Sequence, residues 1–482
     1  MEEGLLNHAL DLADLRGARY ADARLVHNRT ESIAVKDGVV ETLSSSESTG
    51  FGVRVLVGNA WGFASSRELT RGEVDRVTDL ALHIARASAG VGGESVDLGP
   101  PVVSQGVYRT PIQIDPFSIS LEDKIGLLLR ADAEMAGVAG LRTRRSNLTF
   151  IQEDKAFANN EGARTQQTIC EAGGGLQAVA VGNGEVQSRS YPTSFGRQQV
   201  TAGWEAVLDW DLPGNAGRIA TEAVALLTAD PCPSGITTTL ILGGDQVALQ
   251  VHESCGHPIE LDRVFGSEAA YAGTSFLTPE KLDTFQYGSM VVNLTAESVR
   301  PLGLGTFGWD DEGVPAQSTP IVKDGLFVGY LMSRETASRL GKLSNGCMRA
   351  TSWNRIPIIR MTNVSLEAGD WTLEDMIAST DDGIYMETNR SWSIDDKRYN
   401  FQFGTEISYE IKNGKLGRML RNPTYTGLTP QFWNSCDAIA DAKHWKMYGT
   451  PNCGKGQPGQ IAHTGHGAAP ARFRNVHVGV LK

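Results

Sequence analysis

The segment His252-Glu-Ser-Cys-Gly-His257 constrains this chain most, because it places two imidazoles and a carboxylate within six residues. Neutral imidazoles bind zinc, and a carboxylate beside the first histidine is placed to accept a proton from water at the metal. On a regular α-helix, side chains five positions apart point about 140° away from each other and cannot share one ion. We therefore expect a helix that widens to a π-helical turn here, with Gly256 lowering the strain.

A third ligand has to come from another part of the motif or of the chain, because catalytic zinc has three protein ligands and one open position. Cys255 lies inside the motif, but its side chain would need the same helical face as both histidines. Cys453 lies among glycine and proline residues, whose backbone can bring a thiolate to a metal without a regular element. Cys453 is the better candidate, although a single cysteine is usually a small buried hydrophobic residue.

Two other interpretations of the same residues stay open. A structural metal site would have four protein ligands, with Cys255 or another residue as the fourth, in a non-catalytic peptide-binding or assembly subunit. A cysteine hydrolase would use Cys255 as its nucleophile and His257 as its base. The second alternative is weak, because side chains two positions apart on a helix point in different directions.

Four motifs, in order, resemble the TldD branch of the TldD/PmbA metallopeptidases. They are His252-Glu-x-x-x-His257 followed by Glu260-Leu-Asp-Arg263, then Asp310-Asp-Glu-Gly-Val-Pro-Ala-Gln317, Pro357-Ile-Ile-Arg-Met-Thr-Asn363, and Asn452-Cys-Gly-Lys455. The resemblance covers the chain from about residue 230 onward. It implies that His252, His257 and Cys453 bind one zinc ion per chain. It also implies that Glu253 is the catalytic acid and base in peptide-bond hydrolysis.

The resemblance also implies partners. Members of this family work as dimers, often with the metal-free relative PmbA, also called TldE, so we expect a homodimer or a heterodimer. A sheet-edge cleft suits an extended peptide, because main-chain pairing fixes the register without reading side chains. Substrates should therefore be unfolded segments or small, modified peptides rather than folded proteins.

The tail Gln457–Arg474 departs from the family pattern. It is longer and contains more histidine than we expect of the enterobacterial members, which leaves open whether this protein uses the same partner. We interpret His463 and His466 as loop residues. A contact with a metal ligand or with the substrate is the less favoured interpretation of these two histidines.

Composition excludes several other classes of protein. A net charge of -12 without a dense run of Lys and Arg argues against a nucleic-acid partner. No stretch approaches the ~20 apolar residues of a membrane span, so no membrane partner is expected. The start, Met1–His8, lacks the basic region and apolar core of a signal peptide. We expect a cytoplasmic location, where the six cysteines stay reduced.

An internal similarity predicts the fold of the N-terminal half. Gly50–Asn59 aligns with Gly174–Asn183, and each is typical of a strand that ends in a turn. An extended segment precedes each, and an amphipathic helix follows. The first of these helices is expected to begin at a capping box, Thr70-Arg-Gly-Glu73. We expect an N-terminal α+β domain over residues 1–230 with an internal repeat at about 20–90 and 140–228.

The prolines of Asp230-Pro-Cys-Pro-Ser-Gly235 indicate a domain boundary. Beyond it, short apolar runs typical of strands alternate with glycine turns, and Asp324-Gly325 and Asn413-Gly414 have the sequence of hairpin turns. We expect a C-terminal antiparallel, β-barrel-like metallopeptidase domain over residues 231–482 that carries the metal-motif helix. The fold class is therefore α+β.

Four polar residues outside the motif are weaker candidates for substrate binding. Asp310 and Asp311 could bind a cation or a substrate amine, although three acidic residues in a loop are more often a solvated turn. Arg349 and Arg360 could accept a peptide carboxylate, although a structural ion pair is the commoner role of any one arginine.

Overall fold

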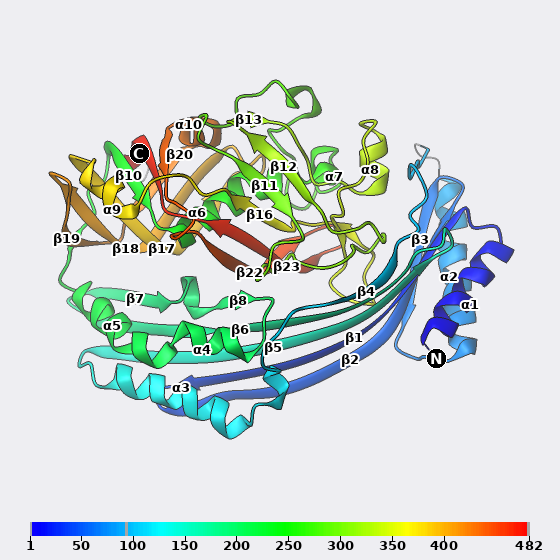
Figure 1. Ribbon diagram of the computed structural model, residues 1–482, viewed down its shortest axis with the longest axis horizontal. Helices are drawn as coiled ribbons and strands as arrows, with labels where there is room; N and C mark the ends of the chain where they lie inside the picture. Colours follow the sequence, from blue (N-terminus) through cyan, green and yellow to red (C-terminus); the bar gives the residue numbers. More distant parts are fainter. Residues whose placement is uncertain (1, 92–94, 480–482) are drawn as a thin grey trace.

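The structure consists of two β-rich halves, one of which lies in the concave face of the other (Figure 1). The computed structural model describes residues 2–91 and 95–479. The N-terminal half forms a long, curved sheet with helices at its ends, and the C-terminal half packs against the sheet (Figure 1). The α+β class predicted from the sequence is confirmed. No helix in the described ranges is long and apolar enough to cross a membrane.

Two long hairpins dominate the N-terminal sheet. Their strands are β1 (Tyr20–Lys36), β2 (Val39–Val57), β5 (Leu141–Asn159) and β6 (Arg164–Gly182). The two segments that the sequence aligns fall mainly on β2 and β6. They lie in one sheet because β1 and β5, the other strands of the two hairpins, pair antiparallel. The strand order is β3-β2-β1-β5-β6-β4, and β7 and β8 also pair with β6. The shorter strands are β3 (Ala60–Ser66), β4 (Gln105–Arg109), β7 (Glu185–Tyr191) and β8 (Gln198–Val200).

Helices cover the two ends of this sheet (Figure 1). They are α1 (Glu2–Leu15) and α2 (Arg71–Ala89) at one end, and α3 (Leu121–Ala136), α4 (Trp204–Trp210) and α5 (Leu212–Ala225) at the other. α2 begins where its capping motif predicts, because the Thr70 side chain accepts a hydrogen bond from the Glu73 N–H. Its buried residues, among them Val74 and Val77, pack in one core with the strands. The domain boundary at residue 230 stays a prediction.

Five strands of the C-terminal half close into the predicted barrel. They are β10 (Ile236–Leu242), β17 (Asp382–Ile394), β18 (Asn400–Lys412), β20 (Thr424–Leu428) and β24 (Ala471–Val478). The ring closes because β17 pairs with both β10 and β18. The sequence predicted an antiparallel barrel, but the β10–β17 pair is parallel. The turn at Asn413-Gly414 joins β18 to β19 (Lys415–Arg421) with both residues at positive φ, as its sequence predicts.

A six-stranded sheet beside the barrel has the order β13-β12-β11-β16-β23-β22. Its strands are β11 (Leu294–Glu297), β12 (Ser318–Lys323), β13 (Leu326–Phe327), β16 (Asn363–Leu366), β22 (Lys446–Lys455) and β23 (Gln460–Ala468). Helix α6 (Gly244–Val251) contacts β17 of the barrel and β16, β22 and β23 of this sheet. The motif helix therefore lies between the two sheets of the C-terminal half.

The remaining strands and α-helices of the C-terminal half are short. They are β9 (Asp230–Pro231), β14 (Met348–Arg349), β15 (Ile358–Ile359), β21 (Cys436–Ile439), α7 (Leu261–Val264), α8 (Arg334–Ser338), α9 (Leu373–Ala378) and α10 (Thr429–Asn434).

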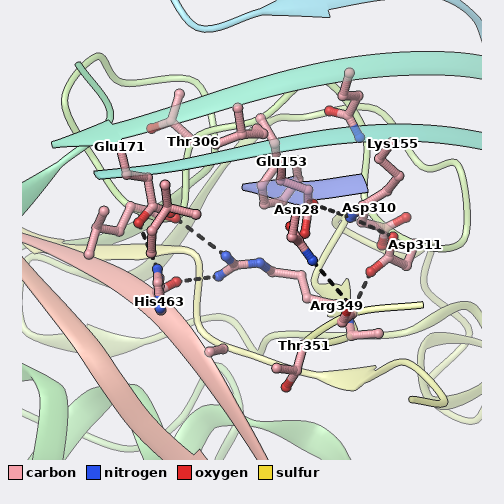
Figure 2. Close-up of a pocket in the computed structure, with 18 of the residues that line it drawn as sticks. Asn28, Glu153, Lys155, Glu171, Thr306, Asp310, Asp311, Arg349, Thr351 and His463 are labelled. Atoms are coloured by element: carbon pink, nitrogen blue, oxygen red, sulfur yellow. Dashed lines mark hydrogen bonds and ion pairs between the residues drawn. The ribbon is translucent and has the colours of Figure 1, made fainter. Parts of the chain in front are cut away.

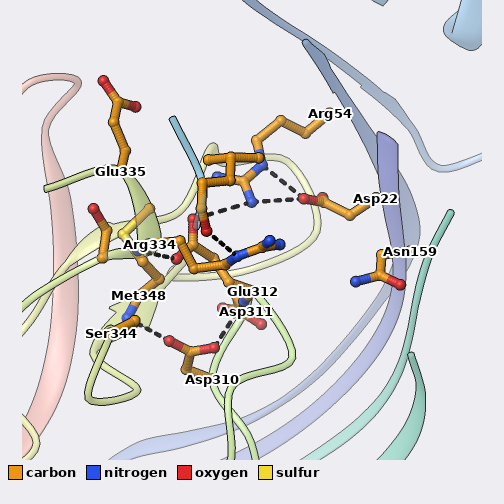
Figure 3. Close-up of polar contacts among 12 residues, drawn as sticks. Asp22, Arg54, Asn159, Asp310, Asp311, Glu312, Arg334, Glu335, Ser344 and Met348 are labelled. Carbon is orange, nitrogen blue, oxygen red and sulfur yellow. Dashed lines mark hydrogen bonds and ion pairs between the residues drawn. The ribbon is translucent and has the colours of Figure 1, made fainter. Parts of the chain in front are cut away.

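Buried charges join the two halves (Figure 3). Arg54 of β2 donates two hydrogen bonds to Asp22 of β1, at 2.8 and 2.6 Å, and lies 3.6 Å from Glu312 of the C-terminal half. The interpretation of residues 310–312 as a solvated turn is wrong, because all three acids are buried. A buried carboxylate needs a partner, and the long sheet supplies arginine and lysine side chains for this loop.

Candidate metal centre

The motif helix widens where the spacing of its histidines predicts. α6 ends at Val251, and His252–Gly256 form a π-helical turn in which the His257 N–H donates to the His252 carbonyl. The wider turn brings the two imidazole rings together, with centroids 4.9 Å apart. Gly256 has ordinary helical angles, φ -56° and ψ -54°, so relief of strain is not its role. A Cβ at this position would lie 2.2 Å from the sulfur of Met361, so a larger residue would require the Met361 side chain to move.

Cys453 of β22 completes a cluster with the two histidines. The ligand atoms of His252, His257 and Cys453 lie within 4.8 Å of one another, and all three residues are buried. The Cys453 sulfur lies 3.7 Å from His257 Nε2. In a tetrahedral zinc site, sulfur and nitrogen ligands are about 3.6 Å apart. The cluster therefore fits a small tetrahedral metal ion.

Buried partners fix which nitrogen of each histidine is free. His257 Nδ1 donates to Glu260 Oε2 at 3.0 Å, which leaves Nε2 on the side of Cys453. His466 Nδ1 lies 2.9 Å from the Val364 carbonyl, an acceptor only, so this nitrogen carries the hydrogen. Burial lowers the pKa of His466 well below its ordinary value, so its Nε2 is unprotonated.

His466 therefore acts as an acceptor for the first histidine of the motif. Its Nε2 lies 2.7 Å from His252 Nδ1, which must donate the hydrogen, and His252 Nε2 is left with a free lone pair. Burial lowers the pKa of His252 as well, which favours the neutral, metal-binding form. Both His463 and His466 lie on β23, so their interpretation as loop residues is wrong.

The two cysteines near the motif have opposite environments. Burial opposes ionisation of Cys453, but the His257 ring and the Arg360 guanidinium favour the thiolate, and the pKa of Cys453 is lowered overall. Burial raises the pKa of Cys255 to about 12. Cys255 is fully buried and is not among the residues that line the cavity at the cluster. The surroundings therefore suit Cys453 as a metal ligand and make Cys255 a poor nucleophile.

Glu253 has a partner that sequence reasoning missed. Arg398, in the loop between β17 and β18, donates to Glu253 Oε2 at 2.6 Å. The two residues are 145 positions apart, and no local pattern marks Arg398. The arginine fixes the orientation of the carboxylate beside the metal cluster.

A cavity of about 300 Å³ opens onto these residues. Both halves of the chain line it, because the loop Thr193–Arg197 follows β7 of the long sheet, whereas Trp392 belongs to β17 of the barrel. Residues Tyr448–Gly454 of β22 form a further wall. The cavity gives the metal cluster and Glu253 access to a ligand from outside.

Three of the four weaker candidates line a different cavity (Figure 2). Asp310, Asp311 and Arg349 border a space of about 330 Å³ that shares no lining residue with the metal cavity. Arg349 donates to the carbonyls of Met361 and His463, at 2.9 and 2.7 Å. Their role as substrate contacts stays a prediction.

Arg360, the fourth weaker candidate, contacts the backbone of the metal cluster at Cys453. It is buried, and its guanidinium donates to the Cys453 carbonyl at 2.6 Å. Its contact with β22 fixes the backbone at the third ligand. A substrate role for Arg360 stays a prediction.

Comparison with known proteins covers nearly the whole chain. Models of the PmbA/TldA metallopeptidase match residues 21–85 (domain 1), 114–229 (central domain) and 236–479 (C-terminal domain). A metalloprotease of Methanocaldococcus jannaschii is 28% identical over 94% of this chain and 95% of its own length. A metalloprotease TldD homolog of Haemophilus influenzae is 26% identical over 98% and 95%. The crystal structure of TldE from Thermococcus kodakarensis has a TM-score of 0.76 at 15% identity, covering 99% of each chain.

Proposed function

Because this chain belongs to the PmbA/TldD metallopeptidase family, we propose that it is a zinc-dependent peptidase that cuts unfolded or small, modified peptides. One observation supports the proposal most. His252, His257 and Cys453 form a three-ligand cluster, and Glu253 lines the same cavity. Three protein ligands beside an open cavity are typical of a catalytic zinc site, whereas a structural site has four.

The proposed chemistry assigns one task to each side chain. Zinc bound by His252, His257 and Cys453 would polarise the scissile carbonyl and make water more acidic. Glu253 would accept a proton from the attacking water and return it to the leaving amine. Arg398 would hold the Glu253 carboxylate in place between these two transfers.

The edge of the six-stranded sheet supports an extended substrate. β22 is the last strand of that sheet, and its residues Tyr448–Gly454 line the cavity. The side chain of Gln198 already binds the main chain of β22 at Met447 and Gly449, at 2.8 and 2.9 Å. We propose that a peptide pairs with β22 beyond this point and so passes the metal cluster.

The partner and location of the protein belong to the same proposal. We propose a homodimer or a heterodimer with a metal-free TldE-like chain, as the family resemblance implies. The likeness to TldE of Thermococcus kodakarensis concerns the fold. We also propose the cytoplasm as its location, because all six cysteines are free thiols.

The proposed function predicts that only an unfolded chain is cut. A folded domain has paired about 90% or more of its buried backbone groups, so it cannot pair with an edge strand. We expect the purified protein to degrade a marginally stable domain without its ligand and to spare the same domain with its ligand bound. Chelation should abolish the cleavage, and added zinc should restore it. Product formation is followed by mass spectrometry.

Two results would contradict this proposal. Equal cleavage rates with and without the stabilising ligand would exclude the extended-peptide model. Full cleavage after the metal has been removed would exclude the zinc chemistry. If the chain cleaves only after a metal-free relative is added, the heterodimer is the active form.

His466 yields a prediction about metal affinity. Replacing it with alanine removes the acceptor for His252 Nδ1, so the ring is free to rotate and to change tautomer. Loss of such a partner typically costs about 10–100-fold in metal affinity. We expect a loss of this size in His466→Ala, measured by competition with a chromogenic chelator.

Two further variants control for that experiment. His466→Gln keeps an acceptor and a donor on one side chain and should recover part of the affinity. His463 lies on the same strand, but its side chain contacts Glu171 and lines the other cavity. His463→Gln should therefore leave the metal affinity unchanged. Unaltered metal affinity in His466→Ala would exclude the positioning role.

A further inference from the structure

Arg197 lines the metal cavity and has no acidic partner among the described residues. Arg197 lies in the loop between β7 and β8 and is half-buried. In residues 2–91 and 95–479, no carboxylate forms an ion pair with it, and its guanidinium packs over the Phe195 ring at 5.0 Å. Burial lowers the pKa of Arg197, but an arginine side chain stays charged at neutral pH. A partly desolvated cation beside a cavity favours an anionic ligand.

The other charged groups of the cavity have partners. Arg398 is engaged with Glu253. Asp245 accepts hydrogen bonds from the main-chain N–H groups of Gln246 and Thr388, at 2.8 and 3.3 Å. No acid that lines the cavity therefore neutralises Arg197 in the described part of the chain.

Two exposed aromatic rings line the same cavity, Phe195 against the Arg197 guanidinium and Trp392 next to Phe195. Phe195 is 37% exposed and Trp392 is 43% exposed, and their centroids are 6.3 Å apart. Phe195 has a φ of 60°, which is unfavourable for a bulky side chain and is often found at functional sites. Exposed rings that line a cavity are available to pack against an apolar ligand group.

We propose that Arg197, Phe195 and Trp392 form a subsite for a peptide, in which the arginine binds a carboxylate and the two rings pack against a neighbouring apolar side chain. The carboxylate is either the C-terminus of the peptide or an Asp or Glu side chain. This inference rests on the proposed peptidase function, because it assumes that a peptide occupies the metal cavity. It adds the chemistry by which the cavity selects that peptide.

Calorimetric binding of matched peptides to the Glu253→Gln variant tests the subsite without any need for turnover. The first pair of N-acetylated decapeptides lacks acidic side chains and ends in a free acid or in an amide. Both members of the second pair end in an amide and differ only by Asp or Asn at one internal position. We expect one pair to show about tenfold tighter binding of the acidic member, since a charged hydrogen bond contributes about that factor or more.

Variants then assign the preference to the subsite. Adding Arg197→Gln should remove it, and adding Arg197→Lys should retain part of it. Trp392→Ala should weaken both members of a pair equally, because it removes apolar contact and no charge. Arg142→Gln removes an exposed arginine that lines neither described cavity, and it should change nothing.

Two outcomes would overturn the inference. Equal affinity for acid and amide in both pairs would show that no carboxylate is bound. A preference that persists in Arg197→Gln would assign the carboxylate to the metal or to Arg398 instead. The proposed function fails by a different result, the absence of peptide cleavage by the unmodified protein, so the two failures are distinguishable.

Discussion

The Glu253→Gln variant should keep its metal and its fold and lose about 10²–10⁴-fold in turnover, because a general acid–base group typically contributes that much. The amide has nearly the shape of the carboxylate but cannot accept a proton from water. Arg398 loses a charged partner and keeps a carbonyl acceptor at the same position. Cleavage rate and zinc content, measured on one preparation, check this expectation together.

The matched control for this variant is Glu280→Gln. It makes the same chemical change at an exposed glutamate outside the metal cavity and should leave the cleavage rate unaltered. Peptide hydrolysis by Glu253→Gln at near the parental rate would rule out the acid–base role. Loss of zinc together with activity would instead show that Glu253 supports the metal cluster.

The second large effect is expected at Cys453. Cys453→Ala should lose most of its zinc and its activity, because the thiolate is one of three ligands and two histidines alone form an incomplete site. Cys255→Ala should keep zinc and activity, because its thiol is buried away from the cavity with a pKa raised to about 12. We compare two quantities for both variants: the zinc content per chain, measured by elemental mass spectrometry, and the cleavage rate.

This pair of variants also separates the alternative interpretations. A cysteine hydrolase would lose activity in Cys255→Ala and would resist chelators. A structural site with Cys255 as fourth ligand would lose metal in both variants. If Cys453→Ala retained full zinc and full activity, the proposed ligand set would be wrong.

Several features of the fold could be predicted because they depend on neighbours in the sequence. The π-helical turn follows from two histidines five positions apart, and the hairpin at Asn413-Gly414 follows from residues that tolerate positive φ. The capping motif at Thr70 predicted the start of α2 for the same reason. The closed barrel was expected from alternating strands and turns, but not the parallel β10–β17 pair, which depends on how the ring closes.

The burial of Asp310–Glu312 shows why a local pattern can mislead. Three acids in a glycine-rich loop are usually solvated, and nothing in that segment indicates otherwise. Their partners Arg54 and Lys155 lie on the long sheet, far away in the sequence. Only the packing of the two halves brings these charges together.

The sequence by itself determined the distorted helix, the paired histidines and the adjacent glutamate, because helical geometry relates side chains a few positions apart. Tertiary structure decided the contacts of that motif with Cys453, Arg398 and His466, which lie 196, 145 and 214 positions from the residues they contact. The register of β22 and β23 beside α6, and the loop between β17 and β18, place these three side chains. Strand register and sheet closure are set by the whole core, so no local pattern could have revealed Arg398 or the role of His466.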